Sequence, residues 1–372
     1  MQRFRDPQFV LILVFLGIIG SVPLLQIAIE ARRGEWPQAL EVFQQPPTAK
    51  NLRRFEQNLG EASWLAARLR PWAQYVQFAW FRDGGEKTLV GRDGWLFYKP
   101  GVQAIQKNSG MAADAVTAIV DFRNQLRARG IQLLVVPAPN KESVYPERLT
   151  RRAVHLPSAE LRAVLQQLSA ADVAVVDLFA LFAAAKTNTA APLYLAQDTH
   201  WSPVGVELAA QAVAQRIVAR GWAHTGTVEY TTRPAPVNRS GDVVRLLQLP
   251  RPVAPETVPC RQVVHSATGV PYRDEPAAEI LVLGDSFLRI YETDEPGAAG
   301  FIAHLAGELK QPVTSLINDG GGATLVRQEL HRRPALLTSK KLVVWEFVER
   351  DLHLATEGWQ CIPLTMDKGT KP

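Results

Sequence analysis

The chain of 372 residues is 47% apolar and 21% charged, which is typical of a globular protein with a substantial core. Its formal net charge of +5 is spread along the chain without a Lys/Arg-rich block or a nucleic-acid motif, so nothing favours nucleic-acid binding. Two cysteines, Cys260 and Cys361, are too few for a disulfide scaffold or a Cys-based metal site; they either form one bridge or remain free thiols.

An apolar segment lies near the start of the chain. Residues 9–29, "FVLILVFLGIIGSVPLLQIAI", carry no charge. As a helix they would span about 30 Å, the thickness of a bilayer core. The alternatives are a buried helix of a soluble protein and a cleaved signal peptide, but the run is long for either and lacks a well-spaced cleavage site. We therefore predict an uncleaved signal-anchor over residues 1–33. Arginines lie on both sides of it, so the positive-inside rule does not decide its orientation.

Residues 34–87 show helical spacing of apolar and aromatic residues and are predicted to form a helical lead-in. The main domain is predicted over residues 88–372, and the stretch "VGRDGWLFYKPG", residues 90–101, lies near its start. Within it, Asp93 and Gly94 are predicted to form a turn between two short strands.

From about residue 109, helices and strands alternate. Short apolar runs predict five strands, at residues 131–139, 173–178, 279–284, 312–319 and 340–347. The helices predicted between them cover residues 111–129, 157–171, 202–221, 297–310 and 323–333. This alternation indicates an α/β domain with a mostly parallel sheet covered on both faces. Residues 222–278 break the rhythm and are predicted to form an irregular excursion that borders a cleft.

The stretch "LVLGDSFLRIYE", residues 281–292, reads as a strand that turns sharply into a helix, with Ser286 at the bend. Ser286 is either the N-cap of that helix or a nucleophile that needs a base with an orienting group. Ligands of parallel sheets sit beyond the carboxyl ends of the strands, where Ser286 lies. The stretches "PAPNKESVY" (137–145) and "NDGGGA" (318–323) end strands at the same edge.

Among seven histidines, His200 has the most suitable neighbour, because Asp198 lies two residues before it in "YLAQDTHWSPVG". In an extended loop, residues i and i+2 project to the same side. The carboxylate would then hold the imidazole so that its other nitrogen takes a proton from a serine hydroxyl. The alternative is a loop histidine beside a solvated aspartate.

The stretch "GDSF" beside an upstream "DTHWSP" resembles the SGNH-hydrolase-like domain of the alginate O-acetyltransferase family. The stretches "GRDGWLFY" (91–98), "VVPAPNKESVYPERL" (135–149) and "VVWEFVERDL" (343–352) also resemble it, so the similarity spans roughly residues 88–353. It implies a three-layer α/β/α fold and a triad of Ser286 as nucleophile, His200 as base and Asp198 as orienter. The membrane-anchored member of the family is the most similar, and the short tail after the last strand leaves no room for a carbohydrate-binding module.

The resemblance also suggests further site residues. Asn318 and Gly321 are candidates for stabilising the oxyanion. The backbone N–H groups of Ser286 and of residues 320–322 are further candidates. The expected cleft residues are Lys141, Tyr145, Tyr291, Trp345 and Arg350.

We expect no metal and no cofactor. The implied partners are a polysaccharide acceptor such as alginate and a membrane-bound O-acyltransferase that supplies acetyl groups, with the domain in the periplasm on the inner membrane. The alternatives are an esterase of the same chemistry and a non-catalytic scaffold of a polysaccharide secretion complex.

Overall fold

The computed structural model describes residues 7–105, 111–151, 159–189, 191–319, 321–354 and 357–364. Contacts within the chain divide it into two compact units. The first comprises the residues up to Arg82 together with Gln248–Pro252, and the second comprises Asp83–Leu247 and the residues from Val253 onward.

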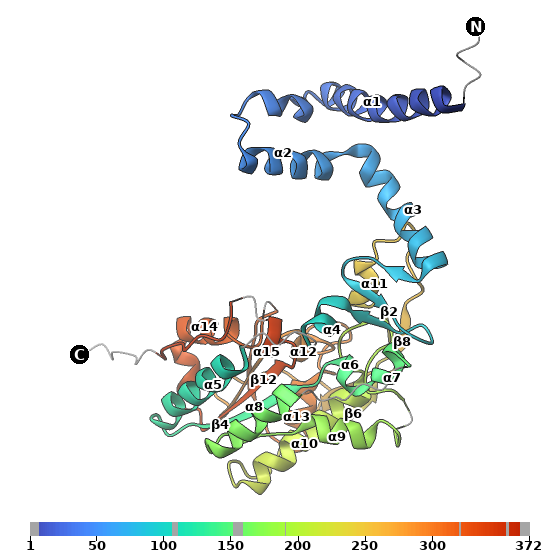
Figure 1. The fold of residues 1–372 in the computed structure, drawn as a ribbon. Helices are drawn as coiled ribbons and strands as arrows, with labels where there is room; N and C mark the ends of the chain where they lie inside the picture. Colours follow the sequence, from blue (N-terminus) through green and yellow to red (C-terminus); the bar gives the residue numbers. More distant parts are fainter. Residues whose placement is uncertain are drawn as a thin grey trace. The chain divides into compact units, whose positions relative to one another are not determined.

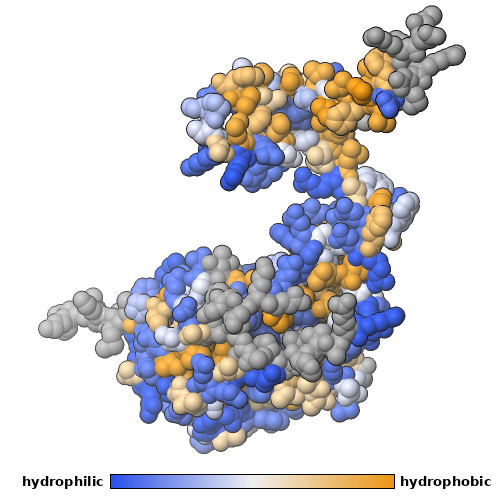
Figure 2. Space-filling model, in the orientation of Figure 1, coloured by the Kyte–Doolittle hydropathy of each residue, from blue (hydrophilic) through white to orange (hydrophobic). Residues whose placement is uncertain are grey.

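The first unit is helical, whereas the end of the predicted lead-in 34–87 belongs to the second unit and contains a short strand at Asp83–Gly84. Helix α1 (Pro7–Arg33) is followed by the 3-10 helix η2 (Gln38–Phe43), α2 (Ala49–Ala62) and α3 (Trp64–Phe81). Thr48 and Ser63 cap α2 and α3 by accepting hydrogen bonds from backbone N–H groups in the first turn. Helix α1 is long and apolar enough to cross a membrane, and Figure 2 shows apolar side chains along most of it.

The second unit is built on a five-stranded sheet in the order β11-β10-β12-β4-β5, with every neighbouring pair parallel. Its strands are β4 (Gln132–Ala138), β5 (Ala174–Val175), β10 (Ile280–Gly284), β11 (Thr314–Ile317) and β12 (Leu342–Val348). All five coincide with predicted strands, although β5 is much shorter than expected. Asp177 ends that run early, because its carboxylate accepts the N–H of Ala180 at 3.0 Å and caps the next helix.

Helices cover both faces of this sheet, which confirms the three-layer α/β/α fold (Figure 1). One core packs α9 (Leu178–Ala185), α10 (Pro203–Ala219) and α13 (Phe301–Leu309) on the sheet. The other packs α5 (Met111–Arg127), α8 (Ala159–Ala170) and α14 (Leu325–Arg332) on the opposite face. Alternate residues of each strand enter the two cores, since successive side chains point to opposite faces. Helix α9 was not predicted, because its uniformly apolar sequence has no helical periodicity.

The excursion at residues 222–278 is more regular than predicted. Strand β6 (Tyr230–Pro234) pairs antiparallel with β9 (Arg261–His265), and β7 (Val237–Arg239) pairs with β8 (Glu256–Val258). Helix α11 (Asp242–Leu246) lies between β7 and β8 in the chain. These strands were not predicted, because the segment is rich in Pro and Thr.

A small antiparallel sheet precedes the main sheet, with strands β1 (Asp83–Gly84), β2 (Thr88–Val90) and β3 (Leu96–Tyr98). The predicted turn between β2 and β3 is confirmed, since Asp93 and Gly94 have φ angles of 53° and 79°. Cys260 is buried and Cys361 is exposed, and both are free thiols. The remaining short helices are α4 (Lys99–Ile105), α6 (Lys141–Val144), α7 (Pro146–Leu149), α12 (Ser286–Arg289), η3 (Pro334–Leu337) and α15 (Asp351–Leu354).

Candidate active site

Ser286 lies at a sharp turn between β10 and α12, as predicted. The N-cap of α12 is Asp285, whose carboxylate accepts the N–H of Phe287 at 2.8 Å, so the hydroxyl of Ser286 is not needed as the cap. The turn is tight at Gly284, where a Cβ atom would meet the carboxylate of Glu346 and lie 2.6 Å from Cδ1 of Leu288. Glycine therefore permits the close approach that exposes Ser286 at the end of the strand.

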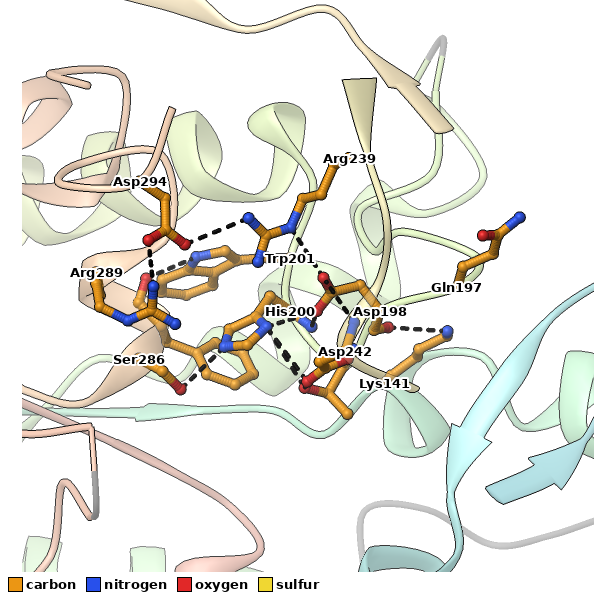
Figure 3. Close-up of polar contacts among 12 residues, drawn as sticks. Lys141, Gln197, Asp198, His200, Trp201, Arg239, Asp242, Ser286, Arg289 and Asp294 are labelled. Atoms are coloured by element: carbon orange, nitrogen blue, oxygen red, sulfur yellow. Dashed lines mark hydrogen bonds and ion pairs between the residues drawn. The ribbon is translucent and has the colours of Figure 1, made fainter. Parts of the chain in front are cut away.

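Asp198, His200 and Ser286 form a continuous hydrogen-bonded row (Figure 3). Oδ1 of Asp198 is 2.6 Å from Nδ1 of His200, and Nε2 of His200 is 2.9 Å from Oγ of Ser286. The Asp198 segment bends instead of running extended, and Oδ1 also accepts the backbone N–H of His200 at 3.1 Å. This local hydrogen bond, typical of an aspartate two residues before its partner, explains why the Asp-x-His spacing brings the two side chains together.

Asp198 is fully buried and remains ionised. Its second carboxylate oxygen accepts Nε of Arg239 at 2.9 Å and the backbone N–H of Asp242 at 3.3 Å. Burial opposes ionisation, but the charge and hydrogen bond of His200 and the charge of Arg239 outweigh it and hold the pKa of Asp198 well below its usual range. The carboxylate can therefore orient the imidazole and stabilise its protonated form.

Asp242 adds a second carboxylate behind the imidazole. It accepts the N–H of Thr199 at 2.7 Å, and its Oδ2 lies 3.7 Å from Nδ1 of His200. Asp198, His200 and Asp242 are close enough to be considered as metal ligands. The set does not suit a cation, because the guanidinium of Arg239 already occupies the free oxygen of Asp198 and Nδ1 of His200 is engaged with the other.

Two buried side chains fix the segment that carries His200. Nε1 of Trp201 donates to the carbonyl of Phe287 at 3.0 Å and so ties this segment to α12. Nζ of Lys141 donates to the carbonyls of Leu96, Ala196 and Asp198 at 2.6, 2.8 and 3.0 Å. Burial lowers the pKa of Lys141 to about 8, although nearby carboxylates partly offset it. Lys141 therefore positions the loop, and the prediction that it lines the cleft is wrong.

Three other predicted cleft residues are also in the core. Tyr145 is buried, and its hydroxyl accepts the N–H of Leu193 at 2.9 Å. Tyr291 is fully buried and donates to the carbonyl of Trp201 at 3.3 Å. Trp345 is fully buried, and its Nε1 donates to the carbonyl of Gly322 at 2.6 Å. Each of the three was predicted to face the cleft, but its side chain is buried in the core.

A cavity of about 220 Å³ opens beside Ser286. Of the predicted residues, Ser286, Gly321 and Arg350 line it, together with Asp285 and Asp319. The guanidinium of Arg350 also lies over the ring of Phe287, 5.6 Å from its centre. Arg350 is thus the one cation among these residues that faces the space beside the serine hydroxyl.

The oxyanion candidates differ in their engagement. The N–H of Gly321 already donates to the carbonyl of Asn318 at 3.1 Å, and Gly322 hydrogen-bonds the carboxylate of Asp285 through its backbone. Asn318 follows β11, with its own N–H bonded to the carbonyl of Gly284 at 2.9 Å. Residue 320 lies outside the described residues. The N–H of Ser286 is at the first position of α12, where the helix supplies no backbone acceptor for it.

Sequence reasoning missed Arg239 and Asp242, which both come from the excursion. Arg239 is the first member of a row of ion pairs, because its guanidinium also contacts Asp294 at 3.3 Å. Asp294 contacts Arg289 (Figure 3). Arg289 in turn contacts Asp319 at 2.8 Å. The only signal in the sequence was the placement of the excursion beside the predicted cleft.

Comparison with known proteins identifies the family of this chain. The family model described as the SGNH hydrolase-like domain of acetyltransferase AlgX matches residues 88–349. The chain belongs to this family. It is an O-acetyltransferase with an SGNH-hydrolase-like domain.

The similar curated proteins are named probable alginate O-acetylase AlgJ. That of Pseudomonas syringae pv. tomato is 26% identical over 290 residues, covering 76% of this chain and 73% of the relative. That of Pseudomonas aeruginosa is 27% identical over 303 residues, covering 77% and 75%.

Two solved structures have the same fold. The O-acetyltransferase domain of Pseudomonas putida AlgJ has a TM-score of 0.57 and 26% identity, covering 72% of this chain and 92% of that one. Pseudomonas aeruginosa AlgX has a TM-score of 0.54 at 18% identity, covering 74% and 66%, which supports the fold alone.

Proposed function

We propose that Ser286, His200 and Asp198 transfer acetyl groups through an acetyl-serine. Nε2 of His200 takes the proton of Ser286, and Oγ attacks the carbonyl carbon of the acetyl donor. When the tetrahedral intermediate collapses, the bond to the donor oxygen breaks and that oxygen takes the proton from His200. The 2.9 Å contact between Nε2 of His200 and Oγ of Ser286, with Asp198 behind the ring, carries this proposal.

In the second half, the acceptor is a hydroxyl group of a secreted polysaccharide. His200 takes the proton of that hydroxyl, whose oxygen attacks the acetyl-serine, and Ser286 recovers its proton as it leaves. The names of the similar proteins make alginate, or a polysaccharide like it, the first acceptor to test. Arg350 faces the cavity where the acceptor and donor would meet.

The negative oxygen of both tetrahedral intermediates needs donors beside Ser286. We propose the backbone N–H of Ser286 and the side chain of Asn318 for this role. One such donor contributes typically about 2.7–4 kcal/mol to transition-state stabilisation.

We propose that residues 1–33 are a signal-anchor in the inner membrane and that residues 88–372 work in the periplasm, joined by the helical lead-in 34–87. Cytoplasmic acetyl donors would not reach this domain, so a membrane-bound O-acyltransferase is the proposed supplier. The full-length protein is then expected to stay in the membrane fraction after high-salt washing. A mature N-terminus mapped beyond residue 30 would rule out the anchor.

The proposal is tested by giving the purified protein a chromogenic acetyl ester, with and without an oligosaccharide acceptor. Transfer predicts ester turnover that depends on Ser286 and acetyl groups on the oligosaccharide detected by mass spectrometry. Turnover that releases only acetate, whether or not acceptor is present, would make the protein an esterase. Absence of any turnover by a folded protein would favour the scaffold.

A further inference from the structure

A second hollow is lined by residues of α10 and α13 and of the ladder of β6 and β9. Its volume is about 530 Å³, compared with about 220 Å³ for the cavity at Ser286, and the two share no lining residue. No residue of the triad or of the row of ion pairs lines it.

A buried imidazole with one unpaired ring nitrogen lines this hollow. His304 is only 8% exposed, and in the part of the chain that the structure describes its Nε2 has no hydrogen-bond partner. The ring also hydrogen-bonds the backbone of Arg261, so Nε2 is the ring nitrogen that is unpaired. Burial lowers the pKa of His304, although Glu207 partly offsets it, so the ring is neutral and Nε2 is an acceptor. A buried acceptor left unpaired destabilises the structure, and a ligand hydroxyl that donates to it would offset this cost.

The neighbouring groups complete a site for hydroxyl groups. Oε1 of Glu207 lies 4.0 Å from Nε2 of His304 and accepts Nε of Arg261 at 2.9 Å. Two acceptors this far apart can each take a proton from one of two adjacent hydroxyl groups. Tyr230 adds an aromatic ring, held by an edge contact with Tyr272 at 5.9 Å between ring centres. Sugars offer this combination of adjacent hydroxyls and apolar ring faces.

The charge of the hollow disfavours recognition through a carboxylate. Glu207 and Glu308 both line it, and its single arginine, Arg261, is already paired with Glu207. A uronate could bind here only with its carboxylate directed to solvent.

The position of the hollow suits a polymer that also reaches Ser286. Helix α10 begins three residues after His200, and Glu207 lies about 6 Å along the helix from its first residue at 1.5 Å per residue. The hollow therefore begins near the same edge of the sheet as the catalytic row.

We propose that this hollow is an accessory subsite that binds one pyranose residue of the acceptor polysaccharide through two adjacent hydroxyl groups, held by His304 and Glu207. The proposal rests on the proposed function for the identity of the ligand. It adds that the enzyme holds its polymer at a second point away from the reacting hydroxyl.

Gly307 offers a way to fill the hollow without disturbing the fold. It lies within α13 and lines the hollow, and a Cβ atom there would meet only Cγ1 of Val263, at 3.8 Å. Gly307→Leu therefore blocks the space, while His304→Leu removes the unpaired acceptor. Gly60→Leu is the matched control, because Gly60 is also helical and a Cβ there has nothing within 4 Å.

Binding is measured by calorimetry with the full chain carrying Ser286→Ala, so that no turnover occurs. The probes are a mannuronate hexasaccharide and cellohexaose, which separate acidic from neutral sugars. At least one probe is expected to bind, with affinity lowered tenfold or more by Gly307→Leu and by His304→Leu but not by Gly60→Leu. With Ser286 intact, all three variants should turn over a small acetyl ester at the normal rate.

Unchanged affinity in a folded Gly307→Leu protein, or no binding of either probe, would overturn the subsite. The proposed function fails differently, through loss of Ser286-dependent turnover of the small ester, which needs no polymer. The two failures are therefore separable.

Discussion

Nε of Arg239 donates a 2.9 Å hydrogen bond to the oxygen of Asp198 that faces away from His200. The aspartate thus holds the imidazole with one oxygen and a guanidinium with the other. Arg239 lies in the excursion, 41 residues after Asp198. The proposed catalytic row is therefore supported by a residue that no local sequence motif contains. This relationship makes Arg239 a positioning residue whose effect is measurable through the ionisation of Asp198.

Arg239→Met should lower turnover of an acetyl ester by at least about tenfold, equivalent to about 1.4 kcal/mol of transition-state stabilisation. Burial raises the pKa of Asp198, and His200 and Arg239 together more than offset this. Removing the guanidinium therefore raises that pKa, and activity should be lost at a higher pH on the acid side of the profile. A purely structural role would lower stability without moving that limb. Arg233→Met is the control, because Arg233 hydrogen-bonds Gln262 within the ladder of β6 and β9.

Asp198→Asn should reduce turnover by about ten-thousand-fold, the loss known for the orienting carboxylate of such a triad. The amide cannot stabilise a protonated imidazole as the carboxylate does. Turnover and circular dichroism are measured together. Asp294→Asn provides the comparison, since Asp294 also contacts Arg239 but does not touch His200. A folded Asp198→Asn protein with near-normal activity would exclude the proposed role.

Gly284→Ala should destabilise the domain by about 1–3 kcal/mol and lower activity, because the new methyl group meets Glu346 and Leu288 at the turn before Ser286. Urea unfolding gives the free energy. Gly60→Ala, at an open helical position, should instead leave stability unchanged or raise it by up to about 1 kcal/mol. Equal effects of the two substitutions would contradict the tight turn.

Buried carboxyls behind the site should make stability fall as pH rises. Burial raises the pKa of Glu349 to about 7, with the hydrogen bond from the backbone N–H of Asn140 partly offsetting it. Burial and the charge of Asp285 raise that of Asp351 to about 7, against the effect of Arg350. Because both pKa values are raised on folding, the native state binds more protons above about pH 4, the value of the unfolded carboxyls. The contribution of these two groups to stability is therefore full at and below about pH 4 and falls until both have ionised, above about pH 7.

Glu349→Gln should remove one proton from this dependence, or about 1.4 kcal/mol per pH unit around pH 6. The slope is measured by urea unfolding between pH 5 and 8. Glu279→Gln serves as the control, since Glu279 is half exposed in a surface pair with Lys341. If Glu349→Gln leaves the slope at its original value, the carboxyl does not titrate in this range.

Much of the second unit was predictable because its signals are local. The apolar runs of the five strands and the turn at Ser286 are written in consecutive residues. The Asp198-His200 pair depends on a hydrogen bond across two residues. Sequence reasoning therefore predicted that these two residues and Ser286 come together.

The surroundings of the row were not predictable in the same way. Position at the carboxyl end of a strand does not reveal whether a side chain turns into the cavity or the core, which is why Lys141 and Tyr145 were misassigned. Arg239 and Asp242 are brought to the site by the antiparallel pairing of β7 and β8. The sequences of these short strands have little periodicity to reveal it. Their contribution depends on tertiary structure that the residues alone do not specify.

The acetyl-serine intermediate is the central claim. The protein is mixed with an acetyl ester, quenched in acid during steady turnover and digested, and its peptides are examined by mass spectrometry. The expected result is one acetyl group on the peptide containing Ser286. His200→Ala should abolish it, while His331→Ala, in a helix on the other face of the sheet, should leave it unchanged. Acetylation at another residue, or an unmodified Ser286 peptide under conditions of measurable turnover, would contradict the mechanism.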